Sequence, residues 1–168
     1  MEQYDVRVGV GDALRVRLLS PPDQNGRRTA LVEQELLPGG LGAPLHRHTR
    51  EDEFSFVLEG ELTVLEDGTV SRYGPGQAVV KTRRHWHTFW NAGADPVRFL
   101  GVFVPGRFVG YYREVAAVSR APSSDAETRR ALAAIDDRYG LLVEKDSVER
   151  LLAAHKLSAV PERTASRR

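Results

Sequence analysis

The pattern His46-Arg47-His48, followed by Glu53 and much later by His87, constrains this chain more than any other feature. Residues two apart on an extended strand point to the same face and lie about 6.6 Å apart along the chain. On a helix, residues that share a face are three or four apart instead, so the two imidazoles would diverge. His46 and His48 therefore predict a β-strand whose side chains can turn toward one ion.

Turn signals on both sides of this pattern favour a site over a chance pair. A His-x-His pair by itself is more often an exposed or hydrogen-bonded pair than a pair of metal ligands. Here Gly40 and Gly60 bracket the motif, and both residues can adopt positive φ. A second strand pattern at residues 77–81 leads through a turn at residues 82–84 to His87. Two hairpins that deliver ligands to one interior indicate a metal site.

Three imidazoles and one carboxylate form a mixed ligand set for one divalent ion. Imidazole nitrogen suits zinc, copper, nickel and iron, and a carboxylate oxygen extends the choice toward manganese. The chain has no cysteine, which excludes thiolate sites and disulfides. We therefore expect one divalent ion (Fe, Mn, Ni, Co, Cu or Zn), and the ligand types alone do not choose among them.

Short strands separated by turn residues are predicted along most of the first 104 residues. They are expected at residues 13–19, 29–37, 45–48, 53–58, 61–66, 69–73, 77–81, 86–91 and 97–104. Many short strands at this spacing indicate a sandwich or a barrel. A closed jelly roll also protects the strand edges and leaves an interior cavity.

The pattern becomes helical after Pro105. Apolar residues recur three and four apart in a segment that would cap one end of the barrel: Phe108, Tyr111, Tyr112 and Val115. Ser124 and Glu127 form a capping-box pattern, which predicts a helix that ends at about Tyr139, before Gly140. Another helix is expected at residues 147–155.

These patterns divide the chain into three parts. We expect a barrel with N-terminal strands and a capping helix over residues 1–118, a helical extension over 119–156, and a frayed tail over 157–168. The tail is basic, so an anionic partner is an alternative to simple solvation. No internal repeat is evident.

Composition limits the kinds of partner. At 168 residues, the chain suits a single compact fold. Its net charge of +1 argues against a nucleic-acid surface or a field that steers it to membranes. No apolar run approaches the roughly 20 residues that span a bilayer, and the first residues lack the order of a secretory signal. We expect a cytoplasmic protein with a small-molecule partner and with neither nucleic acid nor membrane.

Two stretches of the chain resemble the motifs of the cupin superfamily. Gly40-x5-His46-x-His48-x4-Glu53-x6-Gly60 resembles the first motif at each position, and residues 76–91 resemble the second, apart from Thr82 and Arg84, where proline and glycine are usual. The resemblance covers roughly residues 29–115 and implies a double-stranded β-helix, an all-β jelly-roll barrel, here with C-terminal α-helices. It also implies that the metal ligands are His46, His48, Glu53 and His87.

A narrower resemblance points to one group within this superfamily. Residues 44–48 (Pro-Leu-His-Arg-His), 59–61 (Glu-Gly-Glu) and 105–112 (Pro-Gly-Arg-Phe-Val-Gly-Tyr-Tyr) are similar to small single-domain cupins described as quercetin dioxygenase-like. A homodimer is expected from this resemblance. It is also expected because Phe54, Phe56 and Leu58 would form an apolar outer face that a second layer or a partner subunit must cover.

Strand alternation also predicts which residues line the pocket. If Glu53 faces inward, then Ser55 and Val57 do so as well. Relatives that this chain resembles often carry an aromatic residue in place of Ser55, so serine would enlarge the cavity. Phe89 and Asn91 share the face of His87. Phe89 is either an aromatic wall beside the metal or a simple core residue.

The remaining histidines and tryptophans have simpler interpretations. His85 shares the parity of His87, so it is either a pocket residue that donates a proton or replaces a ligand, or an exposed residue of the preceding turn. We expect His155 at the surface of a terminal helix. Trp86 and Trp90 alternate away from the ligand face. We expect both to be packing residues, either within the chain or at a subunit contact.

Three functions remain open from the sequence. The first, implied by the resemblance, is a dioxygenase that cleaves or oxygenates a phenolic or enolic molecule, with Glu53 as ligand and as the catalytic group that assists deprotonation. The second uses the ion as a Lewis acid in a cyclase, isomerase or lyase that acts on a polyketide-like or carbonyl substrate. The third is a noncatalytic binding protein, since the fold alone does not decide function.

Overall fold

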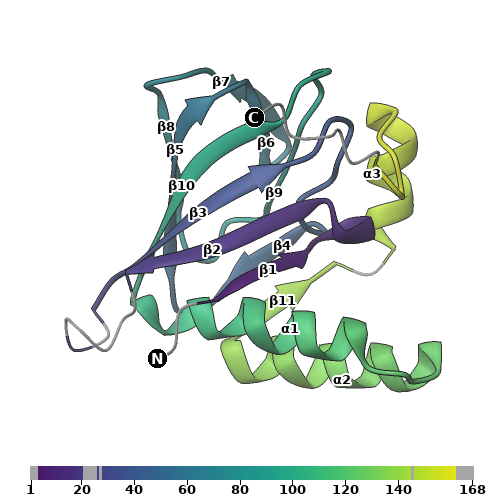
Figure 1. Ribbon diagram of the computed structural model, residues 1–168. Coiled ribbons are helices and arrows are strands. Elements are labelled where there is room, and N and C mark those ends of the chain that lie inside the picture. The colour runs from purple at the N-terminus through teal and green to yellow at the C-terminus, as the bar shows by residue number, and fades with distance from the viewer. Residues whose placement is uncertain (1–3, 21–25, 27, 145, 162–168) are drawn as a thin grey trace.

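Two antiparallel sheets enclose the interior of the molecule (Figure 1). The computed structural model describes residues 4–20, 26, 28–144 and 146–161. The larger sheet has the strand order β1 (Asp5–Val8), β2 (Leu14–Ser20), β3 (Ala30–Leu36), β10 (Val97–Val104), β5 (Asp52–Glu59), β8 (Ala78–Lys81). The smaller sheet has the order β11 (Leu141–Val143), β4 (His46–His48), β9 (His87–Trp90), β6 (Leu62–Glu66), β7 (Thr69–Tyr73).

The predicted jelly-roll fold is confirmed, and its strands lie where the sequence placed them. Each strand expected between residues 13 and 104 is present, and its ends differ by at most one residue from the predicted ends. Two strands had no predicted range, β1 and β11. The second of these has three residues and follows a helix directly, so its alternation is too short to recognise in the sequence. It pairs with β4, the strand that carries the His-x-His motif.

Alternate residues of the long strands fill the space between the sheets. Phe99 and Phe103 of β10 and Val57 of β5 are fully buried. They belong to one core cluster with Leu62 and Val64 of β6, which lies in the other sheet. The apolar side chains of both sheets therefore form one continuous interior, and their burial is the main stabilising contribution.

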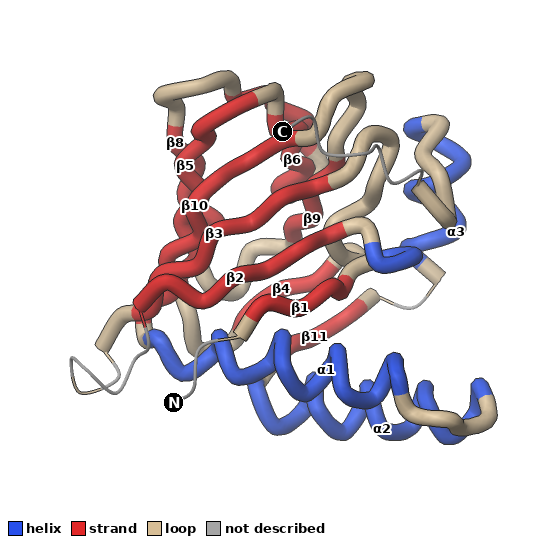
Figure 2. Tube along the Cα trace, viewed as in Figure 1, coloured by secondary structure: helices blue, strands red, loops and turns tan. Residues whose placement is uncertain are grey.

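Two helices lie together across one end of the barrel (Figures 1 and 2). A 3-10 turn, η3 (Gly106–Val109), leads into α1 (Gly110–Arg120), and α2 (Asp125–Tyr139) runs back beside it before β11. The predicted capping box is confirmed, because Ser124 Oγ accepts from the Glu127 amide while the Glu127 carboxylate accepts from the Ser124 amide. Gly140 ends α2 at φ 70°, as predicted.

The third helix, α3 (Ser147–His155), covers the outer side of β9. Trp90 is 2 % exposed and packs with Leu41 and Leu151, so a helix of the same chain covers it rather than a subunit. His155 is half-buried and stacks on Trp90 with ring centroids 4.2 Å apart, which differs from the expected surface position. The sequence could not show this contact, because the two residues meet only in the folded chain.

The three-part division of the chain stays a prediction, but two of its boundaries can be compared with the structure. β11 lies within the expected helical extension, yet it joins the smaller sheet of the barrel. In the expected tail, the Ser158 amide donates to the Gly39 carbonyl at 2.9 Å, so the start of that segment is held against the barrel. Residues 162–168 of the tail lie outside the described residues.

The turns around the first motif use their glycines for two different reasons. Gly60 adopts φ 78°, as the motif predicted, whereas in the earlier turn the positive φ belongs to Gly39, at 65°. Gly40 is required for space instead, since a Cβ there would lie 2.9 Å from both the Ala13 Cβ and the Leu37 carbonyl oxygen. In the second motif Arg84 occupies the usual glycine position and itself adopts φ 72°.

Candidate metal centre

Both sheets contribute side chains to a cluster of potential ligands inside the barrel. His46 and His48 lie on β4, His87 lies directly opposite His46 on β9, and Glu53 comes from β5 of the other sheet. Each residue offers one ligand atom, and these atoms all lie within 4.8 Å of one another. All four side chains are buried, at 5 % exposure or less. We call these four residues the ligand cluster.

Backbone carbonyls orient two of the imidazoles. His46 Nδ1 lies 2.8 Å from the Pro44 carbonyl oxygen, and His87 Nδ1 lies 3.1 Å from that of His85. Because a carbonyl oxygen can only accept, Nδ1 carries the proton in both rings. Each Nε2 is then left with a free lone pair, the form in which imidazole binds a metal.

Burial keeps these two imidazoles neutral. It is the main cause that lowers the pKa of His46 well below its usual value and also lowers the pKa of His87. His48 differs, because two carboxylates outweigh its burial and raise its pKa. One of them is Glu53, whose Oε2 lies 3.5 Å from His48 Nε2 and 3.7 Å from His87 Nε2.

The ligand cluster fits a divalent ion on the evidence of its own unsatisfied atoms. Among the described residues, both ring nitrogens of His48 and Nε2 of His87 are buried without a hydrogen-bond partner. Buried polar atoms of this kind carry a desolvation cost unless a partner compensates it. An ion held by three imidazoles and a carboxylate would provide that partner for Nε2 of His48 and of His87, whereas His48 Nδ1 lies on the side of Glu51. The donor types suit several divalent metals.

Two charged residues beside the cluster were missed in the sequence. Lys81 is fully buried, and its Nζ donates to Glu53 Oε1 at 2.5 Å. Glu51 is 4 % exposed, and its Oε2 lies 3.7 Å from His48 Nδ1, the side of the ring away from Glu53. Strand alternation offered a signal for both, because Lys81 shares the parity of Val79 and Glu51 shares that of Glu53.

The charges around Glu53 favour its ionised form. Burial alone would raise the pKa of this carboxyl, but Lys81, together with His48 and His87, holds that pKa well below its usual range. A carboxylate that stays ionised is suited to binding a cation. It is less suited to taking a proton from a substrate.

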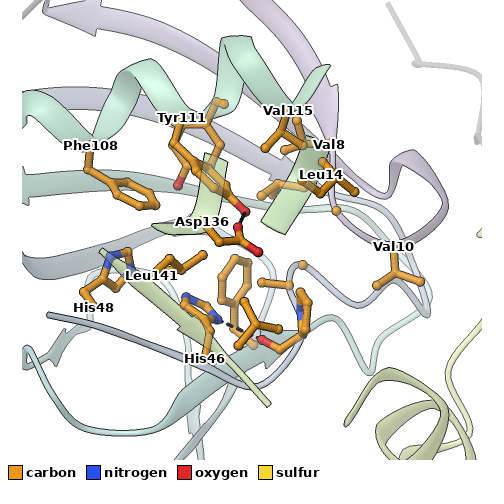
Figure 3. Close-up of a pocket in the computed structure, with 18 of the residues that line it drawn as sticks. Val8, Val10, Leu14, His46, His48, Phe108, Tyr111, Val115, Asp136 and Leu141 are labelled. Atoms are coloured by element: carbon orange, nitrogen blue, oxygen red, sulfur yellow. Dashed lines mark hydrogen bonds between the residues drawn. The ribbon is translucent and has the colours of Figure 1, made fainter. Parts of the chain in front are cut away.

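A cavity of about 330 Å³ lies beside the ligand cluster, with His46, His48 and Glu53 on its wall. Its other walls are mainly apolar and include residues of the two capping helices. Figure 3 shows Tyr111 and Asp136 on the side of the cavity that faces the two histidines. The Tyr111 hydroxyl donates to Asp136 Oδ1 at 2.9 Å. Burial raises the pKa of Asp136 in spite of this hydrogen bond.

The structure brings some of the predicted pocket residues to this cavity and places others elsewhere. Phe89 lies on the cavity wall and also belongs to the core cluster, where its ring centroid is 5.7 Å from that of Phe99, so the structure does not choose between its two interpretations. Ser55 and Val57 face the interior and are fully buried, but neither is among the residues that line the cavity. Asn91 instead closes a turn, where its amide donates to the Leu36 and Asp95 carbonyls.

His85 also lies away from the cavity. Its side chain is 51 % exposed, and its Nδ1 lies 2.7 Å from Asp67 Oδ2. This placement agrees with the turn interpretation and differs from that of a pocket residue. The peptide turns between His85 and His87, so the shared parity does not bring both rings to one side.

Among the described residues, no helix is long and apolar enough to cross a membrane.

Comparison with known proteins supports the fold. Residues 32–103 match the family model described as a cupin domain, and this range contains the whole ligand cluster. A curated relative, 5-aminosalicylate 1,2-dioxygenase from Comamonas sp., is 35% identical over 78 residues. That match covers 46% of this chain but 21% of the relative, so the chain spans about a fifth of its length.

Solved structures give the same fold. A predicted oxalate decarboxylase from Thermotoga maritima has a TM-score of 0.54 and 21% identity, and the match covers 61% of this chain and 93% of that one. A sugar phosphate isomerase of the cupin superfamily from Silicibacter pomeroyi has a TM-score of 0.52 and 26% identity, with coverage of 62% and 71%. The fold is therefore a cupin-type double-stranded β-helix with C-terminal helices.

Proposed function

We propose that this protein is a metal-dependent oxygenase, of the quercetin dioxygenase-like group of small cupins, that acts on a phenolic or enolic molecule. The observation that carries the proposal is the meeting of three imidazoles and a carboxylate within 4.8 Å beside an apolar cavity, with His46, His48 and Glu53 on its wall. The relative named as a dioxygenase of 5-aminosalicylate, a phenol, supports this substrate class.

In this proposal His46, His48, Glu53 and His87 hold one divalent ion. When bound, the ion would supply Lewis acidity and, for a redox-active metal, dioxygen chemistry. The chain itself would orient the imidazoles through the carbonyls of Pro44 and His85. The donor set suits Fe, Mn, Ni, Co, Cu or Zn.

The walls of the cavity favour a small aromatic substrate. Phe89, Phe108 and Tyr111 present ring surfaces to a space of about 330 Å³, which is the size range of small-molecule sites. Asp136 adds a carboxylate whose Oδ1 already accepts from Tyr111. Its second oxygen would accept a hydrogen bond from an amino or hydroxyl group of the substrate.

Glu53 is better suited to the role of ligand than to the role of proton acceptor. Both roles are predicted from the sequence, but Lys81 Nζ donates to one oxygen of Glu53, and the charge of Lys81 lowers the pKa of this carboxyl. We therefore propose Glu53 as a ligand. A bound ion would supply the Lewis acidity that makes a phenol easier to ionise, and the proton would pass to solvent water rather than to Glu53.

A second function, Lewis-acid chemistry without oxygen, is favoured by one of the structural comparisons. The neighbour described as a sugar phosphate isomerase shares 26% identity, and the match covers 62% of this chain. Such a reaction would use the same four ligands. Oxygen consumption separates the two proposals, because only the oxygenase requires it.

The test combines metal analysis with turnover. Protein purified without added metal should carry about one divalent ion per chain, and it should consume oxygen when it converts a member of a phenol panel that includes 5-aminosalicylate. The double variant His46→Ala/His48→Ala should lose both the ion and the activity. His85→Ala is the matched control, because it removes an exposed histidine outside the cavity.

The outcomes separate the three candidate functions. Turnover that proceeds equally without oxygen would favour the isomerase or lyase reaction. Ligand binding without turnover, unchanged in the double histidine variant, would leave a noncatalytic binding protein. The absence of metal from the wild-type protein after reconstitution would contradict the metal site itself.

We also propose that the protein forms a homodimer in the cytoplasm. Phe54 and Phe56 of β5 are 38% and 42% exposed, and Val80 of the neighbouring strand is 45% exposed directly opposite Phe54. These three side chains form an apolar outer face on the larger sheet, next to its edge strand β8. A second copy that covers this face would remove it from water.

A further inference from the structure

A fully buried lysine lies directly behind the ligand cluster. Lys81 is the last residue of β8 and pairs in register with Glu53 on β5. Its side chain has no measurable exposure, and its Nζ lies 4.7 Å from the centre of the Phe89 ring. Lysine is almost never fully buried unless its charge is paired. Here the paired charge belongs to a candidate metal ligand.

The two oxygens of Glu53 have different partners. Oε1 accepts from Lys81 Nζ at 2.5 Å. Oε2 is turned toward the imidazoles, 3.5 Å from His48 Nε2 and 3.7 Å from His87 Nε2. Lys81 therefore holds one side of the carboxylate, and the other side completes the ligand cluster.

We propose that Lys81 is a positioning residue, an internal cation that balances Glu53 in the metal-free protein and holds this carboxylate so that it offers Oε2 alone to the ion. The inference rests on the metal site of the proposed function. Lys81 is not among the residues that line the cavity, so it acts on the site through Glu53 rather than by contact with substrate.

The physical reason is the cost of a buried charge. Without Lys81, the ionised Glu53 would lie in the interior next to three imidazoles and no permanent cation. Breaking a buried ion pair by removing one partner is strongly destabilising, whereas removing both charges is often neutral. A divalent ion would replace the missing positive charge. The metal-free protein should therefore depend on Lys81 more than the metal-loaded protein does.

The experiment compares melting temperatures of four proteins: wild type, Lys81→Met, Glu53→Gln and the double variant. Methionine retains a long unbranched side chain without the charge. In the presence of a chelator, Lys81→Met should melt roughly 6 °C or more below wild type. The double variant should recover most of that loss, because its interior carries neither charge.

Addition of metal provides the second measurement. Saturating Mn²⁺, and separately Zn²⁺, should raise the melting temperature of Lys81→Met by more than it raises that of wild type. Arg83→Met is the matched control. It also replaces a cation paired to a β5 carboxylate, that of Asp52, but both side chains of this pair are partly exposed. Its melting temperature should change by less than about 4 °C, with a metal response like that of wild type.

Each result decides between named alternatives. The internal-cation role is wrong if, in the presence of chelator, Lys81→Met has the same melting temperature as wild type. It is equally wrong if the double variant is no more stable than Lys81→Met. It is also wrong if metal stabilises wild type and Lys81→Met equally. If neither metal stabilises the wild type, the metal site of the proposed function fails instead.

Discussion

Asp136 illustrates how its surroundings set the charge of one side chain. It lies on α2 at the cavity wall and accepts a hydrogen bond from Tyr111. Burial raises the pKa of its carboxyl, and the hydrogen bond from Tyr111 opposes that rise without cancelling it. The ionised form is therefore less favourable in the folded protein than in the unfolded chain.

This raised pKa gives a prediction for the pH dependence of stability. As pH rises from the unfolded pKa of about 3.9 to the higher folded pKa, the unfolded chain loses its proton first. The contribution of Asp136 to the free energy of unfolding therefore falls over this window. Asp136→Asn cannot ionise, so its stability relative to wild type should increase from pH 3 to pH 7.

Denaturant unfolding at several pH values measures that difference. Asp137→Asn is the control, since Asp137 is the exposed neighbour on the same helix. A difference between Asp136→Asn and wild type that is constant with pH, or that decreases as pH rises, would contradict the prediction. Only the difference is diagnostic, because other carboxyls have lowered pKa values and act in the opposite direction, Glu33 and Asp5 among them.

At the scale of elements, the turn between β8 and β9 connects Lys81 to His87. Arg84 adopts φ 72° there, and its amide donates to the His48 carbonyl at 2.7 Å. A left-handed backbone costs a residue with a Cβ roughly 1–2 kcal/mol. The second cupin motif usually has glycine at this position, and the structure shows that the turn keeps the glycine conformation.

Arg84→Gly should therefore stabilise the protein slightly. The relief of strain is offset by the greater backbone freedom of glycine in the unfolded chain, roughly 0.5–1 kcal/mol. We expect a net gain of up to about 1 kcal/mol in the free energy of unfolding, measured by chemical denaturation. Thr82→Gly, in the same exposed turn but without positive φ, should lose stability. Equal losses in the two variants would rule out strain at Arg84.

The smaller sheet depends on an element from a distant part of the sequence. β11 follows α2 and pairs with β4, where Leu141 lies opposite His48 and Val143 opposite His46. Leu141 and Val143 also line the cavity. The helical extension therefore supports the strand of the His-x-His motif directly and closes one side of the cavity.

At the scale of the whole molecule, the outer face of Phe54, Phe56 and Val80 predicts self-association. Light scattering after gel filtration should give a mass near twice the chain mass of 18.7 kDa. Phe54→Ser/Phe56→Ser should shift the protein toward the monomer, because it removes the apolar area that a second copy would cover. Val70→Ser changes an exposed apolar residue on β7 of the other sheet and should leave the dimer intact. A monomeric wild type would contradict this proposal.

Sequence by itself determined the strand positions between residues 13 and 104 and the four residues of the ligand cluster. Alternation with period two fixes which side chains face the interior, and turn residues fix where strands end, so both are local properties. His46 and His48 could be assigned to one strand face from spacing alone. The capping box at Ser124 and the stop at Gly140 were equally local.

Only the tertiary structure decided which charges and walls surround that centre. Lys81 meets Glu53, Asp136 meets Tyr111, and His155 stacks on Trp90 through contacts between distant segments. No local period encodes such contacts, because they depend on strand register and on how the helices close the barrel. The sequence therefore specified a candidate metal site, and the folded chain specified the charges around it and the cavity beside it.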